Sequence, residues 1–143
     1  MKSIPRLTIL ILILLPVALV RGGSPRPATV LTLSISRSTL RNVEDAAGRW
    51  QFEGGKVFEG NKQVAYYSSI KRVIMGGTDA QNTAMLTMTI FFLGGSSPEN
   101  ITLQGSHNFS SGKQVGSVSA ASEAQSSLIG RRFLRAGDVL TIE

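Results

Sequence analysis

The sequence predicts an all-β domain, an antiparallel eight-stranded barrel, with a β-sandwich as the alternative. About eight segments that alternate apolar and polar residues follow one another at intervals of roughly ten to fifteen residues. Glycine, proline, asparagine and aspartate mark the turns between them. After residue 22 no stretch keeps a helical period for more than a turn or two. The barrel is preferred because a closed sheet has no exposed edges.

Residues 1–22 predict a cleaved secretory signal peptide, which leaves residues 23–143 as a single barrel domain. Lys2 and Arg6 precede a long apolar run from Leu7 to Val20, and small residues follow at Gly22-Gly23. A basic start, a short apolar run and a small-residue end are typical of signal peptides. An uncleaved N-terminal anchor is the alternative. We therefore predict a secreted or periplasmic protein with no membrane contact after cleavage.

Composition excludes several classes of function. The sequence has no cysteine, so disulfide bonds and a lipoprotein anchor are excluded and an apolar core must stabilise the domain. Three of its 15 basic residues lie in the predicted signal peptide, which leaves a small excess over the 9 acidic residues. The remaining basic residues form no stripe with interleaved aromatics. We predict no nucleic-acid partner and no cofactor.

The first predicted strand is Thr29–Ser36, in which apolar and polar residues alternate. Residues 38–49 are the most charged and least apolar part of the domain, and they predict a long connection. Trp50–Glu53 predicts a short strand that ends at two glycines. Lys56–Phe58 then leads to Gly60-Asn61, which predicts a two-residue hairpin turn.

Two long strands are predicted in the middle of the chain. The first is Val64–Ile74, whose more apolar face is predicted to point inward and carries Val64, Tyr66, Ser68, Ile70, Arg72 and Ile74. The second is Thr83–Phe92, which has one wholly apolar face and also carries Met85 and Phe91 on the other. Such a strand is predicted to lie centrally or to have its outer face covered by another subunit.

A hairpin is predicted from two strands, Ile101–Gln104 and Val115–Ala120, joined by a polar connector at residues 106–112. Ser122 followed three residues later by glutamine has the form of a capping box, which would start a helix of a turn or two. Asp138–Ile142 predicts a short closing strand.

Several motifs between Gly60 and Ile142 occur in an order that is similar to a known family. They are Gly60-x-x-x-Val64-x-Tyr66, the Thr-rich strand Thr83–Phe92, Ile101-Thr102-x-x-Gly105, Val115-Gly116-Ser117-Val118 and Leu128–Phe133. Together they resemble the allene oxide cyclase and dirigent superfamily of eight-stranded barrels. This resemblance implies a secreted barrel with an apolar pocket, often packed into trimers, whose dirigent-like members steer the coupling of phenoxy radicals.

The chain departs from that family at one motif. Ser119-Ala120-Ala121-Ser122 stands where the family has a Gly-Gly-Thr-Gly-like turn, and the cysteine that plant cyclases use in their pocket is absent. Inherited cyclase chemistry is therefore not predicted, and we leave open whether the protein is an enzyme.

Three residues are candidates for ligand binding: Tyr66, Arg72 and Arg131. Tyr66 and Arg72 share one face of a predicted strand and, inside a barrel, would orient a small anion or a phenol. The alternative is that Arg72 pairs with Asp79 or Glu59 as structural support and that Tyr66 is a core residue. Arg131 and its neighbour Arg132 would point to opposite faces of a strand, so one of them is predicted to enter the barrel.

No catalytic or metal-binding motif is present. His107 is the single histidine, and we predict that it lies exposed in the hairpin connector. The sequence has neither a nucleophile elbow nor a phosphate-binding loop. One histidine without cysteine also argues against a transition-metal site.

Two hypotheses about function follow. The first is a dirigent-like or allene-oxide-cyclase-like barrel that binds a small apolar or phenolic molecule. The second is a non-enzymatic structural or interaction protein that assembles into homo-oligomers, trimers by resemblance, through the strand face that carries Met85 and Phe91. A hydrolase that depends on His107 is a third and weaker alternative.

Overall fold

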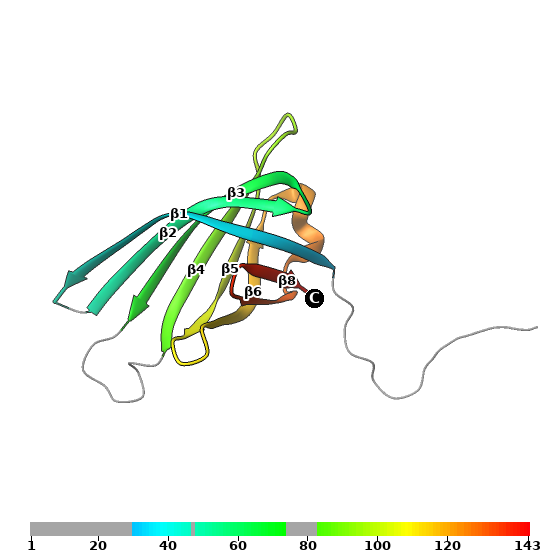
Figure 1. Cartoon of the computed structure of the whole chain (residues 1–143). Coiled ribbons are helices and arrows are strands. Elements are labelled where there is room, and N and C mark those ends of the chain that lie inside the picture. The colour runs from blue at the N-terminus through cyan, green and yellow to red at the C-terminus, as the bar shows by residue number, and fades with distance from the viewer. Residues whose placement is uncertain (1–29, 47, 74–82) are drawn as a thin grey trace, which may run out of the picture.

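The computed structural model describes residues 30–46, 48–73 and 83–143. The predicted signal peptide and the predicted turn after Ile74 lie outside these ranges. Within them, eight antiparallel strands form a closed barrel in chain order, and the last strand pairs with the first (Figure 1). The predicted fold class is confirmed, and the architecture is the barrel rather than the sandwich.

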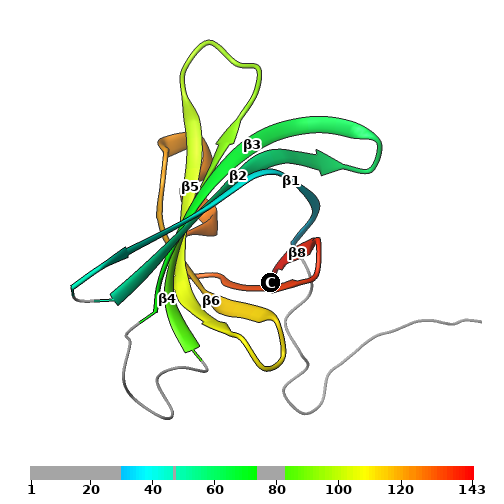
Figure 2. The same ribbon diagram turned by 60° about the vertical axis from the view of Figure 1, so that its left-hand side comes forward.

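Each strand is the neighbour of the next one in the sequence, so the chain winds once around the barrel (Figure 2). The strands are β1 (Leu31–Asp45), β2 (Gly48–Glu59), β3 (Lys62–Val73), β4 (Thr83–Phe92), β5 (Glu99–Asn108), β6 (Lys113–Ala121), β7 (Arg132–Ala136) and β8 (Val139–Ile142). A short 3-10 helix, η2 (Glu123–Leu128), connects β6 to β7.

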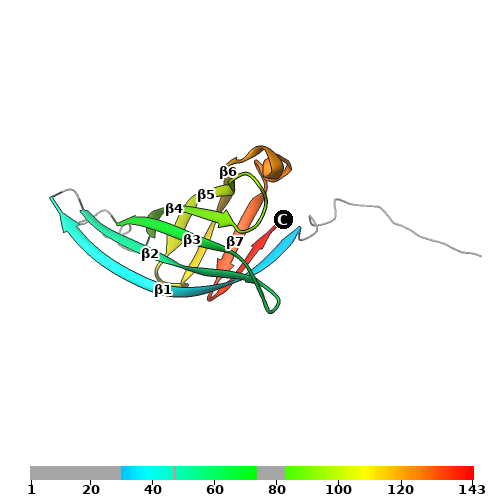
Figure 3. The same cartoon turned by 90° about the horizontal axis from the view of Figure 1, so that it is seen from above.

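The barrel is closed at one end and widens at the other. Residues Leu31–Ser34 of β1 pair with β8, whereas beyond Ile35 strand β1 pairs with β2 alone. Figures 1 and 3 show β1, β2 and β3 continuing past the closed part as a curved sheet. We call the end at which β1 leaves β8 the wide end.

Apolar side chains from all eight strands fill the closed part of the barrel. The predicted apolar face of β4 points inward, and Met88 and Ile90 on it are fully buried. Leu128 of η2 joins the same core cluster from the opposite end to the wide end. The other core residues are Leu33, Ile35, Val57, Ala65, Tyr67, Leu86, Ile101, Leu103, Val118, Phe133, Leu140 and Ile142. The predicted inward face of β4 is confirmed, whereas Met85 on its outer face is 66% exposed, so the covering of that face by another subunit stays a prediction.

The predicted long connection at residues 38–49 is wrong, because β1 continues through most of it to Asp45 and pairs with β2 throughout. Its side chains are exposed on both faces there, so the sequence shows no alternation. The predicted break at Gly54-Gly55 is also absent, since β2 runs through both glycines. At Gly55 a Cβ atom would overlap the carbonyl oxygen of Ser36, so glycine allows β1 and β2 to approach beside a bulge in β1.

The two predicted hairpins are confirmed. Gly60-Asn61 forms the turn between β2 and β3, with Gly60 at φ +63°. Strands β5 and β6 form the later hairpin, but they extend to Asn108 and from Lys113, so the connector is shorter than predicted. A short helix follows as expected. Its predicted capping box is wrong, because the Ser122 hydroxyl accepts a hydrogen bond from the backbone N–H of Asn100 (3.1 Å).

Candidate ligand-binding site

Strand β3 turns inward the face opposite to the predicted one. Tyr67, Ser69 and Lys71 are buried, whereas Tyr66 is 50% exposed. The prediction failed because it compared the two faces of β3 alone. Pairing with β4, whose apolar face must point inward, fixes the register and places Lys71 opposite Leu86.

The structure does not bring the three predicted ligand-binding residues together. Tyr66 lies outside the barrel and stacks on Phe91, with ring centroids 5.2 Å apart. The Arg72 guanidinium lies over the ring of Trp50, 5.1 Å from its centroid, on the same outer face. Arg131 is exposed and precedes β7. The placement of this trio inside a barrel is therefore wrong.

Of the alternatives for these arginines, one part is wrong and another lies outside the described residues. Among the described residues Arg72 forms no ion pair with Glu59, and Asp79 lies outside the described residues. Arg132 is exposed and pairs with Glu143 at 3.8 Å. The arginine that enters the barrel from β7 is Arg135.

A group of polar side chains lies inside the barrel toward the wide end, and we call it the inner polar cluster. Most members are buried, and they come from six different strands. They are Arg37 of β1, Gln51 and Glu53 of β2, Tyr67, Ser69 and Lys71 of β3, His107 of β5, Gln114 of β6, and Arg135 of β7. Polar residues are rarely retained in the interior of a small barrel without a structural or binding role.

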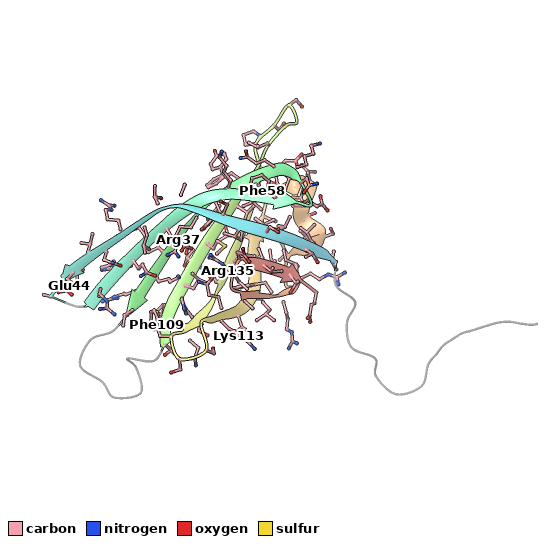
Figure 4. The ribbon with its side chains drawn as sticks, viewed as in Figure 1. Arg37, Glu44, Phe58, Phe109, Lys113 and Arg135 are labelled. Atoms are coloured by element: carbon pink, nitrogen blue, oxygen red, sulfur yellow. The ribbon has the colours of Figure 1, made fainter. Side chains whose placement is uncertain are left out.

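Glu53 is the centre of charge in this cluster. Its carboxylate is 2.8 Å from Arg135 Nη1 and 3.5 Å from Arg37 Nε, and both arginines are labelled in Figure 4. Glu53 and Arg135 are buried, at 6% and 8% exposure, while the Arg37 side chain is half exposed. Burial alone would raise the pKa of Glu53, but the hydrogen bond and charge of Arg135 outweigh it and lower the pKa.

Tyr67 and Lys71 lie close enough to this ion pair for its charges to act on them. Burial, with the Glu53 charge, raises the pKa of Tyr67 to about 12, so its hydroxyl stays protonated. Burial lowers the pKa of Lys71; the Arg135 and Arg37 charges lower it further, and the Glu53 charge partly opposes them. Lys71 Nζ donates to Gln51 Oε1 at 3.2 Å.

Three polar atoms of the cluster are buried without a hydrogen-bond partner among the described residues. They are Tyr67 Oη, Ser69 Oγ and Gln114 Oε1. Leaving such an atom unpaired costs about 1–3 kcal/mol, so native structures pair most of them. Because three occur in one cluster, they provide donors and acceptors for a bound polar group.

His107 is not the exposed turn residue that the sequence predicted. It lies on β5 with its Nδ1 3.3 Å from Gln114 Nε2, and its ring stacks on Phe109 with centroids 4.5 Å apart. Burial, with the positive charges of Lys71 and Arg135, lowers its pKa to about 4. The neutral ring then accepts a hydrogen bond from the Gln114 amide.

We expect the low pKa of His107 to make the fold weaken between about pH 6.5 and about pH 4. In this range the unfolded chain binds a proton that the folded chain does not. The free energy of unfolding therefore decreases as the pH decreases. His107→Gln removes the imidazole that binds this proton. Between pH 7 and pH 4.5, urea unfolding should show a smaller loss for this variant, by roughly 1 kcal/mol because the ring is partly exposed. Equal losses in both proteins would contradict the assignment.

The described residues provide no centre for a metal ion: they contain no cluster of three His, Asp or Glu side chains. No helix among them has the length and apolar character needed to cross a membrane.

No family model, curated protein or solved structure matches this chain. The resemblance to the allene oxide cyclase and dirigent superfamily therefore remains a prediction.

Sequence reasoning missed Glu53, Lys71 and Arg135. Glu53 and Lys71 are charged residues within predicted strands, which was the available signal, whereas Arg135 follows Phe133-Leu134 in a segment that does not alternate. Alternation separates the two faces of a strand but does not say which face points inward.

Proposed function

We propose that the protein is an exported barrel that binds a small apolar or phenolic molecule, with the polar group of the ligand at the inner polar cluster. The observation that carries the proposal is the set of three unpaired polar atoms, on Tyr67, Ser69 and Gln114, beside a buried ion pair. Binding sites commonly combine a few convergent polar groups with apolar walls.

The chemistry of the cluster favours a ligand that both donates and accepts hydrogen bonds. The hydroxyls of Tyr67 and Ser69 can donate or accept, whereas Gln114 Oε1 only accepts. Arg37 and Arg135 outnumber the single carboxylate of Glu53, so a partly negative phenol oxygen is favoured there. Leu86 pairs with Lys71 on the inner face of the sheet and offers apolar surface to the rest of the ligand.

Binding of 4-propylphenol, a probe with a phenol and a short apolar chain, tests this proposal. We expect saturable one-to-one binding by calorimetry, weakened about five- to tenfold by Tyr67→Phe or Ser69→Ala, the equivalent of one lost hydrogen bond. Neither variant should destabilise the fold by more than about 1 kcal/mol, because each removes a polar atom that has no hydrogen-bond partner among the described residues.

The chain offers a matched control beside each of these residues. Tyr66→Phe and Ser68→Ala change the same kinds of residue on the outer face of β3 and should leave the affinity for 4-propylphenol unchanged. Absence of binding to the wild-type protein, or equal weakening by inner and outer variants, would refute the proposal.

A second candidate function is assembly through the outer face of β3 and β4. Met85 is 66% exposed, and Tyr66 and Ile70 are exposed on the same face beside Phe91. A hollow of about 650 Å³ is lined by residues of β1–β3, which include Phe52 and Ile70 as well as Glu53 and Ser69 of the inner polar cluster. A monomer in light scattering would exclude this candidate.

A further inference from the structure

Lys71 is in an unusual position for a lysine. The structure describes Lys56, Lys62, Lys71 and Lys113, and the other three are exposed, whereas Lys71 is 3% exposed on the inner face of β3. A buried ammonium ion is costly unless a carboxylate pairs with it.

No carboxylate among the described residues pairs with Lys71. The two oxygens of Glu53 pair with Arg135 and Arg37, and the Glu53 charge reaches Lys71 without an ion pair. The amine donates a hydrogen bond to the neutral side-chain carbonyl of Gln51. A desolvated amine next to other cations favours its neutral form, which has a free electron pair for reaction with an electrophile. The lowered pKa of Lys71 agrees with this geometry.

We propose that Lys71 is a nucleophilic amine that forms a Schiff base with a small aldehyde or ketone, an inference that rests on the ligand-binding function proposed above. The Nζ electron pair attacks the carbonyl carbon to form a C–N bond, while the C=O π electrons move to oxygen. Transfer of a proton from nitrogen to that oxygen gives a carbinolamine. Loss of water then gives the imine. The overall reaction joins amine and carbonyl and releases one water, with no oxidation or reduction.

The neighbours of Lys71 suit this reaction. Tyr67 and Ser69 lie on the same inward face of β3, four and two residues before it, and their hydroxyls have no partner among the described residues. They can hydrogen-bond the carbonyl oxygen and then the carbinolamine oxygen.

Reductive trapping with 4-hydroxybenzaldehyde tests the inference. The protein is incubated at neutral pH with this aldehyde and sodium cyanoborohydride, which reduces an imine to a stable secondary amine, and the labelled lysine is identified by peptide mass spectrometry. We expect Lys71 to be labelled faster than Lys56, Lys62 or Lys113, because a lowered pKa leaves a larger fraction of its amine neutral at neutral pH. Labelling of the exposed lysines at the same rate as Lys71 would overturn the proposal.

Two variants distinguish the loss of the Lys71 amine from the loss of the folded structure. Lys71→Met removes the amine, and Lys71→Arg keeps a cation that forms no Schiff base; both should lose the fast labelling, while Lys62→Met should keep it. If either Lys71 variant folds and is still labelled by the aldehyde as fast as the wild-type protein, the proposal is overturned.

The 4-propylphenol titration distinguishes failure of this inference from failure of the proposed function. If the wild-type protein binds 4-propylphenol but is not trapped at Lys71, the Schiff-base inference is wrong and the binding function stands. If Lys71 is trapped and 4-propylphenol does not bind, the amine is reactive and the phenolic ligand class is wrong.

Discussion

Glu53→Gln is expected to lower the free energy of unfolding by about 3 kcal/mol at pH 7, because it removes one charge of a buried ion pair and leaves the other. Arg135, 8% exposed, would keep its charge beside a neutral amide, while the half-exposed Arg37 can turn to solvent. Urea unfolding of the purified protein measures the loss. The difference should shrink as the pH falls below the ordinary glutamate value of 4.5 and through the lowered pKa of Glu53, since the carboxylate gives this stability only while it is ionised.

The exposed pair Arg132–Glu143 provides the matched control. Its charged groups are 3.8 Å apart, and the Arg132 side chain is 77% exposed. Arg132→Gln should therefore change the free energy of unfolding by less than about 0.5 kcal/mol. Similar losses for Glu53→Gln and Arg132→Gln would mean that the inner pair is solvated, and the inner polar cluster would not be a buried site.

Gly116→Ala is expected to cost about 3 kcal/mol, because the added methyl group meets backbone that cannot move aside without breaking the β5–β6 ladder. Gly116 pairs with Gly105, and a Cβ on Gly116 would overlap the carbonyl oxygen of Gln104. Gly105→Ala should lower the free energy of unfolding by a similar amount, since its Cβ would overlap the carbonyl oxygen of Val115. Thermal or urea unfolding of both variants measures the effect.

Gly54→Ala is the control for these two changes. Gly54 also lies within a barrel strand, but the nearest atom to its Cβ would be the Tyr67 carbonyl oxygen at 3.2 Å, which a small shift relieves. Its cost should stay below about 1 kcal/mol, partly offset by the lower entropy of the unfolded chain. If Gly116→Ala and Gly54→Ala cost the same, the close approach of β5 and β6 is not a constraint on the fold.

Much of the fold could be predicted because its signals are local. The alternation in Thr83–Phe92 leaves one possible inward face, and Gly60-Asn61 between two β-prone segments indicates a hairpin. The alternation of apolar and polar residues is lost where a strand extends beyond the closed part of the barrel, as in residues 38–45 of β1. Neither face of the strand is buried there, so neither face requires apolar residues.

The candidate site could not be predicted from its own residues. On β3 the face with Tyr66 and Ile70 is the more apolar, yet it points outward, and the face with Ser69 and Lys71 points inward. Glu53 and Arg135 are 82 residues apart in the chain, and neither segment carries information about the other.

The sequence alone determined that this chain forms a strand meander without disulfides, because alternation, turn residues and the absence of cysteine are local or compositional properties. Only the tertiary structure decided which side chains enter the barrel. The inward face of each strand is fixed by pairing with its neighbours, and burying the apolar face of β4 forces Tyr67, Ser69 and Lys71 inside as well. The inner polar cluster is therefore a product of the closed sheet.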